Sequence, residues 1–361
     1  MDEGMKVELV EIPSDETAAE TRIKELRTEI MSGGGPDVFI LGNRSGPKLF
    51  ENPEKAMYSD AFLPLDDYMN AAEYMKPEEW NQVILESGRT GEGQILLPLE
   101  YTFPAFAFQS SYLADPGEIP SSTEELLSCE DPLIGESAVS LPYPMTYSLS
   151  ELADYQQETL FYSEEELQKR MEEMASYESK WSPDSQQEGI VAWGEVNGTF
   201  FSDIDRNSKE EQTVFAYPND QGGVTACVQT YAAINRNTEK PEQAFSLLDF
   251  LLSNEVLSGQ GFPRGEDKWA GSNNFFVSGT GGISVNQTVA QKMCRSQTSK
   301  DALQEMNSQI TAVRYNSQLD SEIDQLCEEC LMGRMQQPEY KAERKEAVTR
   351  TYERMKMQLS E

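Results

Sequence analysis

The sequence predicts an α/β protein made of two lobes, and three observations lead to this prediction. The chain has 361 residues, which is more than one hydrophobic core of ordinary size supports. Residues 6–12, 17–32 and 37–41 have the patterns of a strand, a helix and a second strand,. A further strand and helix are predicted in the second half, at 222–235 and 241–253. A strand, helix and strand in close succession predict a parallel sheet.

The first predicted elements also suggest where a ligand binds. The helix at 17–32 places Ile23, Leu26 and Ile30 on one face, and three glycines and a proline then end it,. Residues 37–41 form an unbroken apolar run, typical of a strand buried on both faces,. In open α/β sheets, ligands bind beyond the carboxyl ends of the strands. The residues that follow this strand are therefore candidates for ligand contact.

The middle of the chain is predicted to be helical around one apolar, aromatic stretch. Short helices are expected at 63–75 and 77–86. Two prolines interrupt the stretch 95–108, so it should leave one sheet, bend and enter another,. Residues 115–188 look mostly helical, and Ser163 has the position of an N-cap before several glutamates,.

The second half alternates predicted strands and helices. Residues 189–193 and 199–201 are expected to be short strand or turn pieces around the turn signal Asn197-Gly198,. Small and β-branched residues predict a strand at 222–235, and a proline in the first turn favours a helix at 241–253,. Residues 259–282 resemble a loop, and the last 60 or so residues are predicted to be helical.

Composition excludes several classes of function. The net charge is −34, and so acidic a surface disfavours nucleic acids and anionic lipids as partners,. The chain has no histidine, which excludes a Ser-His-Asp triad, a Cys-His pair and a histidine-based zinc site,. No apolar run approaches the roughly 18 residues of a membrane span,.

Neither the cysteines nor the acidic residues predict a metal or cofactor site. Cys327 and Cys330 fall on the apolar stripe of one predicted helix, where they behave as small hydrophobic residues,. The series Asp203-x-Asp205-x-Asn207 begins like a calcium loop but lacks its glycine and its final glutamate,. No phosphate loop or dinucleotide fingerprint is present,. We therefore expect no catalytic residue, metal or cofactor.

Aromatic residues are the strongest remaining signal for a ligand. The apolar faces of sugar rings stack on aromatic side chains, while their hydroxyl groups need polar partners. Each aromatic residue taken alone has core filling as its alternative role. The candidates are Tyr101, Phe103, Trp181, Trp193, Phe200, Tyr231, Trp269 and Tyr315.

Four segments, in order, resemble the extracellular solute-binding proteins of ABC importers, family 1, which includes maltose- and oligosaccharide-binding proteins. They comprise the helix, glycine stop and Pro-Asp strand of 27–39 and the stretch Leu97-Pro98-Leu99-Glu100-Tyr101. They also comprise 189–200 with Asn197-Gly198, and the strand and helix between 223 and 252. Here the family's first strand and helix, and a lipoprotein signal, do not precede residue 6.

The resemblance implies a two-lobed periplasmic-binding-protein-like type II fold with a hinge and an interlobe cleft. It implies an N-terminal lobe of residues 1–103 and 229–305 and a C-terminal lobe of 104–228 and 306–361. The implied role is capture of a small solute, a carbohydrate, by a monomer that delivers it to ABC permease subunits. The native form would be an extracellular, membrane-anchored lipoprotein. Together, the resemblance and the aromatic pattern nominate as ligand-binding residues Asn43, Arg44, Glu100, Tyr101, Thr102, Phe103, Phe200, Tyr315, Trp181 and Trp269, with Arg314 as an alternative to Tyr315.

Two other functions remain open from the sequence. A secreted acidic glycoside hydrolase would use a pair of carboxylates, and 63 acidic residues make such a pair easy to find. A scaffold without a ligand is the third alternative, and it would show no thermal shift with any small solute.

Overall fold

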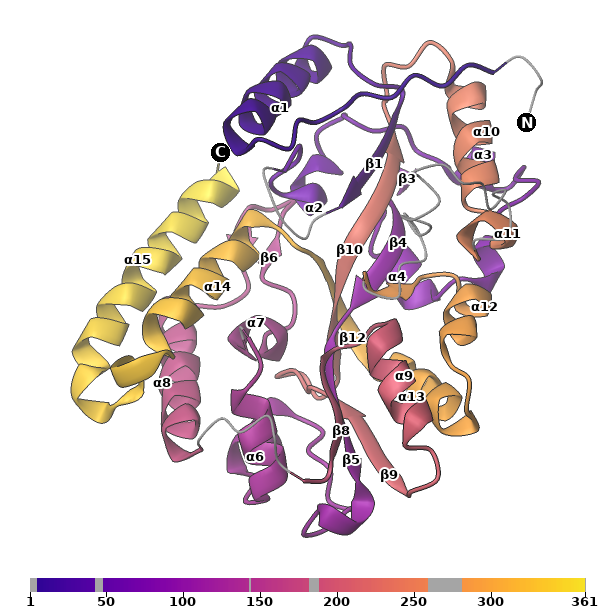
Figure 1. The fold of residues 1–361 in the computed structure, drawn as a ribbon. Coiled ribbons are helices and arrows are strands. Elements are labelled where there is room, and N and C mark those ends of the chain that lie inside the picture. The colour runs from indigo at the N-terminus through magenta and orange to yellow at the C-terminus, as the bar shows by residue number, and fades with distance from the viewer. Residues whose placement is uncertain (1–4, 43–47, 143, 182–187, 259–280, 361) are drawn as a thin grey trace. The chain divides into compact units, whose positions relative to one another are not determined.

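The computed structural model describes residues 5–42, 48–142, 144–181, 188–258 and 281–360 (Figure 1). The chain divides into two compact units, each built from two separate stretches of sequence. Unit 1 comprises Met1–Tyr101 and Val228–Lys292, and unit 2 comprises Thr102–Cys227 and Met293–Glu361. The chain therefore passes from one unit to the other three times. Of the described residues, 48% are helical and 18% lie in strands.

In the described part of the chain, the larger sheet has five strands, four of them in the order β1-β10-β4-β11. These four are β1 (Val38–Gly42), β10 (Val224–Ile234), β4 (Leu97–Thr102) and β11 (Ile283–Ser284), and most of their residues belong to unit 1. The apolar strand predicted at 37–41 and the long strand predicted at 222–235 are both confirmed. The prediction of parallel pairing is wrong for β1, which runs antiparallel to β10 with Val38 opposite Ile234.

The strand predicted at 6–12 is also wrong. Residues 6–12 have no assigned secondary structure, and their apolar side chains face solvent, with Val7 47% and Leu9 73% exposed. β1 ends the path of its sheet, and β10 is the neighbour with which it pairs. An alternating pattern predicts a strand only where a neighbouring strand completes the ladder, and among the described residues none pairs with this segment.

The helices of unit 1 are short apart from α1 and α10, which Figure 1 places on opposite sides of the sheet. They are α1 (Glu16–Met31), α2 (Pro53–Ala56), α3 (Asp66–Met69), α4 (Gln82–Glu86), α10 (Pro241–Leu251), α11 (Asn254–Leu257) and α12 (Gln287–Ala290), with 3-10 turns η1 (Pro77–Glu79) and η3 (Gln291–Met293). A small hairpin joins β2 (Arg89–Thr90) to β3 (Gly93–Gln94). The predicted inward face of α1 is confirmed, because Ile23, Leu26 and Ile30 are buried. Helix is less extensive than predicted at 63–75 and 77–86, where only single turns form.

Unit 2 contains a second sheet with the order β8-β5-β9. Its strands are β5 (Pro104–Gln109), β8 (Ile190–Glu195) and β9 (Gln212–Ala216), and both outer strands run antiparallel to β5. The predicted bend within 95–108 is confirmed, since β4 and β5 belong to different sheets and are separated by Phe103. β12 (Ile310–Tyr315) of this unit pairs with β10 and is the fifth strand of the larger sheet.

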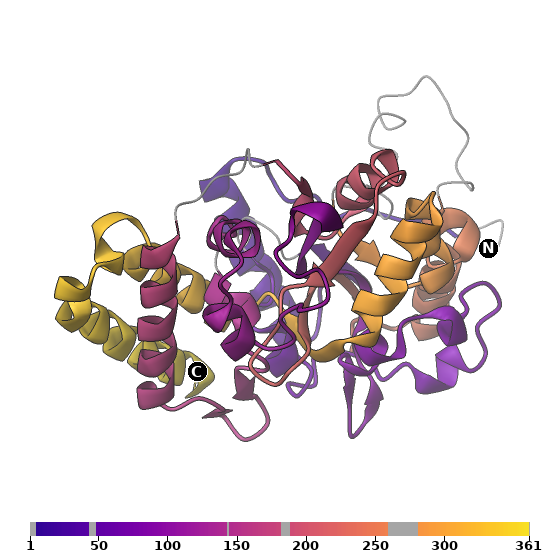
Figure 2. The same ribbon diagram turned by 90° about the horizontal axis from the view of Figure 1, so that it is seen from below.

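Helices cover both faces of the sheet of unit 2. Figures 1 and 2 place α6 and α8 on one side of it and α9 and α13 on the other. The helices are α5 (Thr123–Ser128), α6 (Pro132–Val139), α7 (Pro144–Ser148), α8 (Glu164–Lys180), α9 (Gly198–Arg206), α13 (Gln297–Ser308), α14 (Gln318–Cys330) and α15 (Lys341–Ser360), with 3-10 turns η2 (Ser110–Tyr112), η4 (Gly333–Gln336) and η5 (Pro338–Tyr340). A short hairpin of β6 (Ala153–Asp154) and β7 (Thr159–Leu160) precedes α8.

Local sequence signals explain how two of these helices begin. Ser163 caps α8 in a capping box with Glu166, which confirms the predicted N-cap,. The turn or strand predicted at 199–201 is wrong, because these residues lie in α9. The side chain of Asn197 accepts hydrogen bonds from the amides of Thr199 and Phe200, so it acts as a helix N-cap rather than as part of a hairpin turn,.

The core of unit 2 confirms the predicted role of the cysteines. Cys327 and Cys330 are both buried on α14, in a cluster with side chains of α8 and α15. Burial raises the pKa of Cys330 to about 12, so the thiol stays neutral,. Val348, Met355 and Leu359 of α15 belong to the same cluster. Across the described residues, no helix is both long and apolar enough to cross a bilayer.

The passages between the units lie at Tyr101/Thr102, Cys227/Val228 and Lys292/Met293. The lobes implied by the resemblance change at residues 103, 228 and 305. The third position differs most, since residue 305 lies within α13. Helix α13 packs on α9 and β9 of unit 2, and these contacts assign the whole helix to that unit.

Candidate functional site

The candidate ligand-binding residues are distributed over both units. Asn43, Arg44 and Trp269 lie outside the described residues. The remaining candidates are described below, first those of unit 1 and then those of unit 2.

In unit 1, Glu100 and Tyr101 lie next to each other on β4. Both are buried, and the Glu100 carboxylate accepts a hydrogen bond of 3.3 Å from the Thr230 hydroxyl of β10. Tyr101 lies opposite Ile283 in the pairing of β4 with β11. Strand pairing therefore fixes the backbone that carries both residues.

In unit 2, Thr102 and Phe103 are joined to the end of β8. The Thr102 hydroxyl donates to the Val196 carbonyl at 3.0 Å, and the Val196 amide donates to the Phe103 carbonyl at 2.9 Å. Both side chains are fully buried. The residues around Val196 therefore lie directly beside these two candidates, although they are far from them in the sequence.

Phe200 and Trp181 occupy different sides of unit 2. Phe200 lies in the first turn of α9, is 4% exposed and makes an edge-to-face contact with Phe201. Trp181 directly follows α8 and packs its ring against Gly135 of α6, where even a Cβ atom would overlap the ring. Because α6 and α8 lie on one side of the sheet and α9 on the other (Figures 1 and 2), these two aromatic residues do not share one stacking surface.

Tyr315 and Arg314 lie at the end of β12, and both are buried. The Arg314 Nη2 donates to the backbone carbonyl of Thr146 in α7 and lies 3.4 Å from the Asp320 carboxylate. Among the described residues, two other guanidinium nitrogens, Nε and Nη1, and Oδ1 of Asp320 have no hydrogen-bond partner. A buried polar atom without a hydrogen bond lowers the stability of the folded state. Such atoms usually bond to water or to a polar ligand.

A tyrosine and a glutamate that the sequence analysis missed lie beside these candidates. The Tyr147 hydroxyl donates to the Glu195 carboxylate at 2.8 Å. Tyr147 is in the buried helix α7, and the half-buried Glu195 ends β8 next to Val196. Burial and the nearby Glu195 raise the pKa of Tyr147 well above its usual value, so the phenol remains a hydrogen-bond donor,. The strand predicted at 189–193 ends two residues before Glu195, and it was the one local feature of the sequence that pointed to this position.

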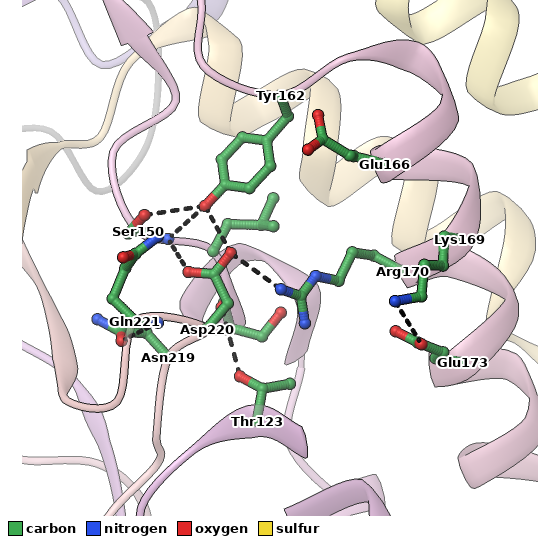
Figure 3. A network of polar contacts seen from close by, with 12 residues as sticks. Thr123, Ser150, Tyr162, Glu166, Lys169, Arg170, Glu173, Asn219, Asp220 and Gln221 are labelled. Carbon is green, nitrogen blue, oxygen red and sulfur yellow. Dashed lines mark hydrogen bonds and ion pairs between the residues drawn. The ribbon is translucent and has the colours of Figure 1, made fainter.

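A second polar network in unit 2 is complete within the protein (Figure 3). The Asp220 carboxylate accepts hydrogen bonds from the Tyr162 hydroxyl at 2.8 Å, from Arg170 at 3.2 Å and from the Ser150 amide at 3.2 Å. Its backbone amide donates to the Ser148 carbonyl at 2.9 Å. The network ties the loop before β10 to α8 and to the end of α7, and we assign it a structural role.

The acidic residues that resembled a calcium loop have structural partners. The Asp205 carboxylate accepts hydrogen bonds from the amides of Arg295 and Ser296 and from the hydroxyls of Ser296 and Ser299, at the start of α13. Asp203 pairs with Arg206. Within the described ranges, no group of three or more cysteine or acidic side chains is arranged to hold a metal ion.

Comparison of the fold with solved structures finds solute-binding proteins. An extracellular solute-binding protein family 1 from Alicyclobacillus acidocaldarius matches with a TM-score of 0.58 at 15% identity, over 94% of this chain and 88% of that one. A periplasmic oligogalacturonide-binding protein from Yersinia enterocolitica matches with a TM-score of 0.53 at 14% identity, over 94% of this chain and 88% of that one. A cyclic α-maltosyl-1,6-maltose binding protein from Arthrobacter globiformis matches with a TM-score of 0.53 at 12% identity, over 92% of this chain and 88% of that one. These matches establish the periplasmic solute-binding protein fold.

A comparison of the sequence with curated proteins finds no match. A family model described as bacterial extracellular solute-binding protein matches residues 2–257, which is more than half of the chain. The family is one of binding proteins, so the glycoside hydrolase considered above is set aside. On this evidence, the chain belongs to the family of bacterial extracellular solute-binding proteins.

Proposed function

We propose that this chain is the substrate-binding component of an ABC importer and that it captures a carbohydrate for delivery to membrane permease subunits. The family match over residues 2–257 is the observation that carries this proposal. The choice of a carbohydrate is supported by the sugars in the names of three structures with a similar fold. These sugars are an oligogalacturonide, mannotriose and a cyclic maltosyl-maltose. An extracellular location agrees with the family's description.

The ligand contacts that we propose are those predicted from the sequence, with the exception of Trp181. In unit 1 they include Glu100 and Tyr101, whose backbone is fixed by strand pairing. In unit 2 they include Thr102, Phe103 and Phe200, beside the turn that links β8 to α9. The packing of Trp181 against α6 favours a structural role for that residue.

A thermal-shift screen against neutral, acidic and amino oligosaccharides tests the proposal. A ligand that binds only the folded protein stabilises it by about 2.7 kcal/mol at a concentration of 100 times Kd. For units of this size, that gain raises Tm by roughly 5–10 °C. Such a shift with one sugar series, and unchanged sugar recovered afterwards, is the expected result. If no sugar shifts Tm while amino acids or peptides do, the carbohydrate assignment is wrong.

A further inference from the structure

Helix α7 of unit 2 is unusual because a five-residue helix is wholly buried and yet rich in polar contacts. All five of its residues are buried. The Thr146 hydroxyl donates to Asp324 of α14, the Thr146 carbonyl accepts from Arg314 of β12, and the Tyr147 hydroxyl donates to Glu195 of β8. Three different elements of unit 2 therefore hold this one helix turn in place.

We define the α7 cluster as Thr146, Tyr147, Glu195, Arg314, Asp320 and Asp324. It carries three carboxyl groups and one guanidinium, so its ionised form is negative overall. Within the part of the chain that the structure describes, two nitrogens of Arg314 and one oxygen of Asp320 have no hydrogen-bond partner, although both side chains are almost entirely buried. This contrasts with the completed network around Asp220 in the same unit.

Glu195 is the member of the cluster that adjoins the proposed ligand contacts Thr102 and Phe103. It lies opposite Pro104 at the first position of β5, and the next residue, Val196, bonds to both Thr102 and Phe103. It is half-buried, whereas Tyr147, Arg314 and Asp320 are buried. A partly exposed carboxylate whose position is fixed by a buried tyrosine is well suited to accept hydrogen bonds from hydroxyl groups.

We propose that Glu195, oriented by Tyr147, contacts the ligand in unit 2 and selects neutral polyhydroxyl sugars over anionic ones. This inference rests on the proposed carbohydrate-binding function. A carboxylate accepts hydrogen bonds from sugar hydroxyls, and such charge-assisted bonds are stronger than neutral ones. The same charge, reinforced by the other carboxyl groups of the α7 cluster, repels the carboxylate of a uronic acid. Tyr147 acts as a positioning residue, because its hydroxyl fixes the carboxylate.

Titration calorimetry with two probes tests this inference. The probes are the neutral oligosaccharide that stabilises the wild-type protein most in the screen above, and trigalacturonate. We expect Glu195→Gln to weaken binding of the neutral sugar about tenfold. The same substitution should also lower the ratio of the affinity for the neutral sugar to the affinity for trigalacturonate. Tyr147→Phe should weaken neutral-sugar binding less, because the carboxylate is retained but is no longer fixed.

Glu210→Gln is the matched control, because it removes the same charge from an exposed loop of unit 2 and should leave both affinities unchanged. Melting curves of every variant check that it is folded. If the wild-type protein binds a sugar and Glu195→Gln binds it equally well, or if trigalacturonate is the preferred probe, the inference is wrong and the proposed function stands. If the wild-type protein binds no carbohydrate, the proposed function fails and this inference fails with it.

Discussion

Helix α8 meets a buried carboxyl group near each of its ends, and the two groups are stabilised in different ways. Near its start, Arg170 reaches the Asp220 carboxylate, which also accepts hydrogen bonds from Tyr162 and Ser150 (Figure 3). Near its end, Glu178 is 8% exposed, and burial raises its pKa to about 8. The first group has a cation and several donors, whereas the second becomes neutral over most of the physiological range.

This difference shows how unit 2 tolerates buried acidic groups in a chain of net charge −34. Where a carboxylate joins segments that are distant in sequence, it is supplied with donors and remains a structural acceptor. A buried carboxyl group without such donors, like that of Glu178, is more stable in the protonated form than in the ionised form,. The predictions below test the two cases separately.

Asp220→Ala should produce the largest loss of stability, about 3–5 kcal/mol. It leaves the Arg170 guanidinium, the Tyr162 hydroxyl and the Ser150 amide without their shared acceptor. Urea denaturation at pH 7 measures the loss. Glu173→Ala is the control on the same helix, because its ion pair with Lys169 is exposed and should contribute less than about 1 kcal/mol,. Equal losses for the two variants would show that the network contributes no more than a surface pair.

The Asp220 network also shows which parts of the fold could be predicted from sequence. Ser163 was correctly predicted as the cap of α8, because capping depends on residues within one turn,. The loop that brings Asp220 to that helix lies between β9 and β10, and no local pattern connects the two. The antiparallel pairing of β1 with β10 was missed for the same reason, since partners distant in sequence decide it.

The candidate site was predictable only where the family resemblance or an aromatic residue marked it. Asn197-Gly198 was interpreted as a turn, although Asn is also a frequent N-cap. Phe200, Phe201 and Ile204 are buried at helical spacing, a signal that could have identified α9,. Tyr147 and Glu195 meet only through the pairing of β8 with β5 and the placement of α7, so their contact could not be read from either segment alone.

Glu178→Gln should remove a pH dependence of stability. The pKa of Glu178 in the folded protein, about 8, lies above its ordinary value near 4.5. Below pH 4.5, both the folded and the unfolded states are protonated. Between the two values only the unfolded state ionises, so stability falls as pH rises, by at most about 1.4 kcal/mol per pH unit. Above pH 8 both states are ionised and the loss is complete.

The variant should therefore be nearly as stable as the wild-type protein at pH 4.5 and more stable by up to about 4 kcal/mol at pH 8.5. Urea denaturation at the two pH values measures the difference, with Glu173→Gln as the control for the loss of one charge on α8. Parallel profiles for Glu178→Gln and the wild-type protein would show that Glu178 is ionised in the folded state.

Tyr162→Phe should have the smallest effect, about 1–2 kcal/mol, because it removes one donor from Asp220 and leaves Arg170 and the Ser150 amide in place,. Burial raises the pKa of Tyr162 to about 12, so the hydroxyl remains a donor across the pH range of the other measurements. The loss should consequently be the same at pH 6 and pH 9, unlike the effect of Glu178→Gln. In a double-mutant cycle, Tyr162→Phe should cost little once Asp220 has been replaced by alanine, because the acceptor is already gone. If the two losses were instead additive, the hydroxyl would stabilise unit 2 through its other contact, with Ser150, and Asp220 would not be the centre of the network.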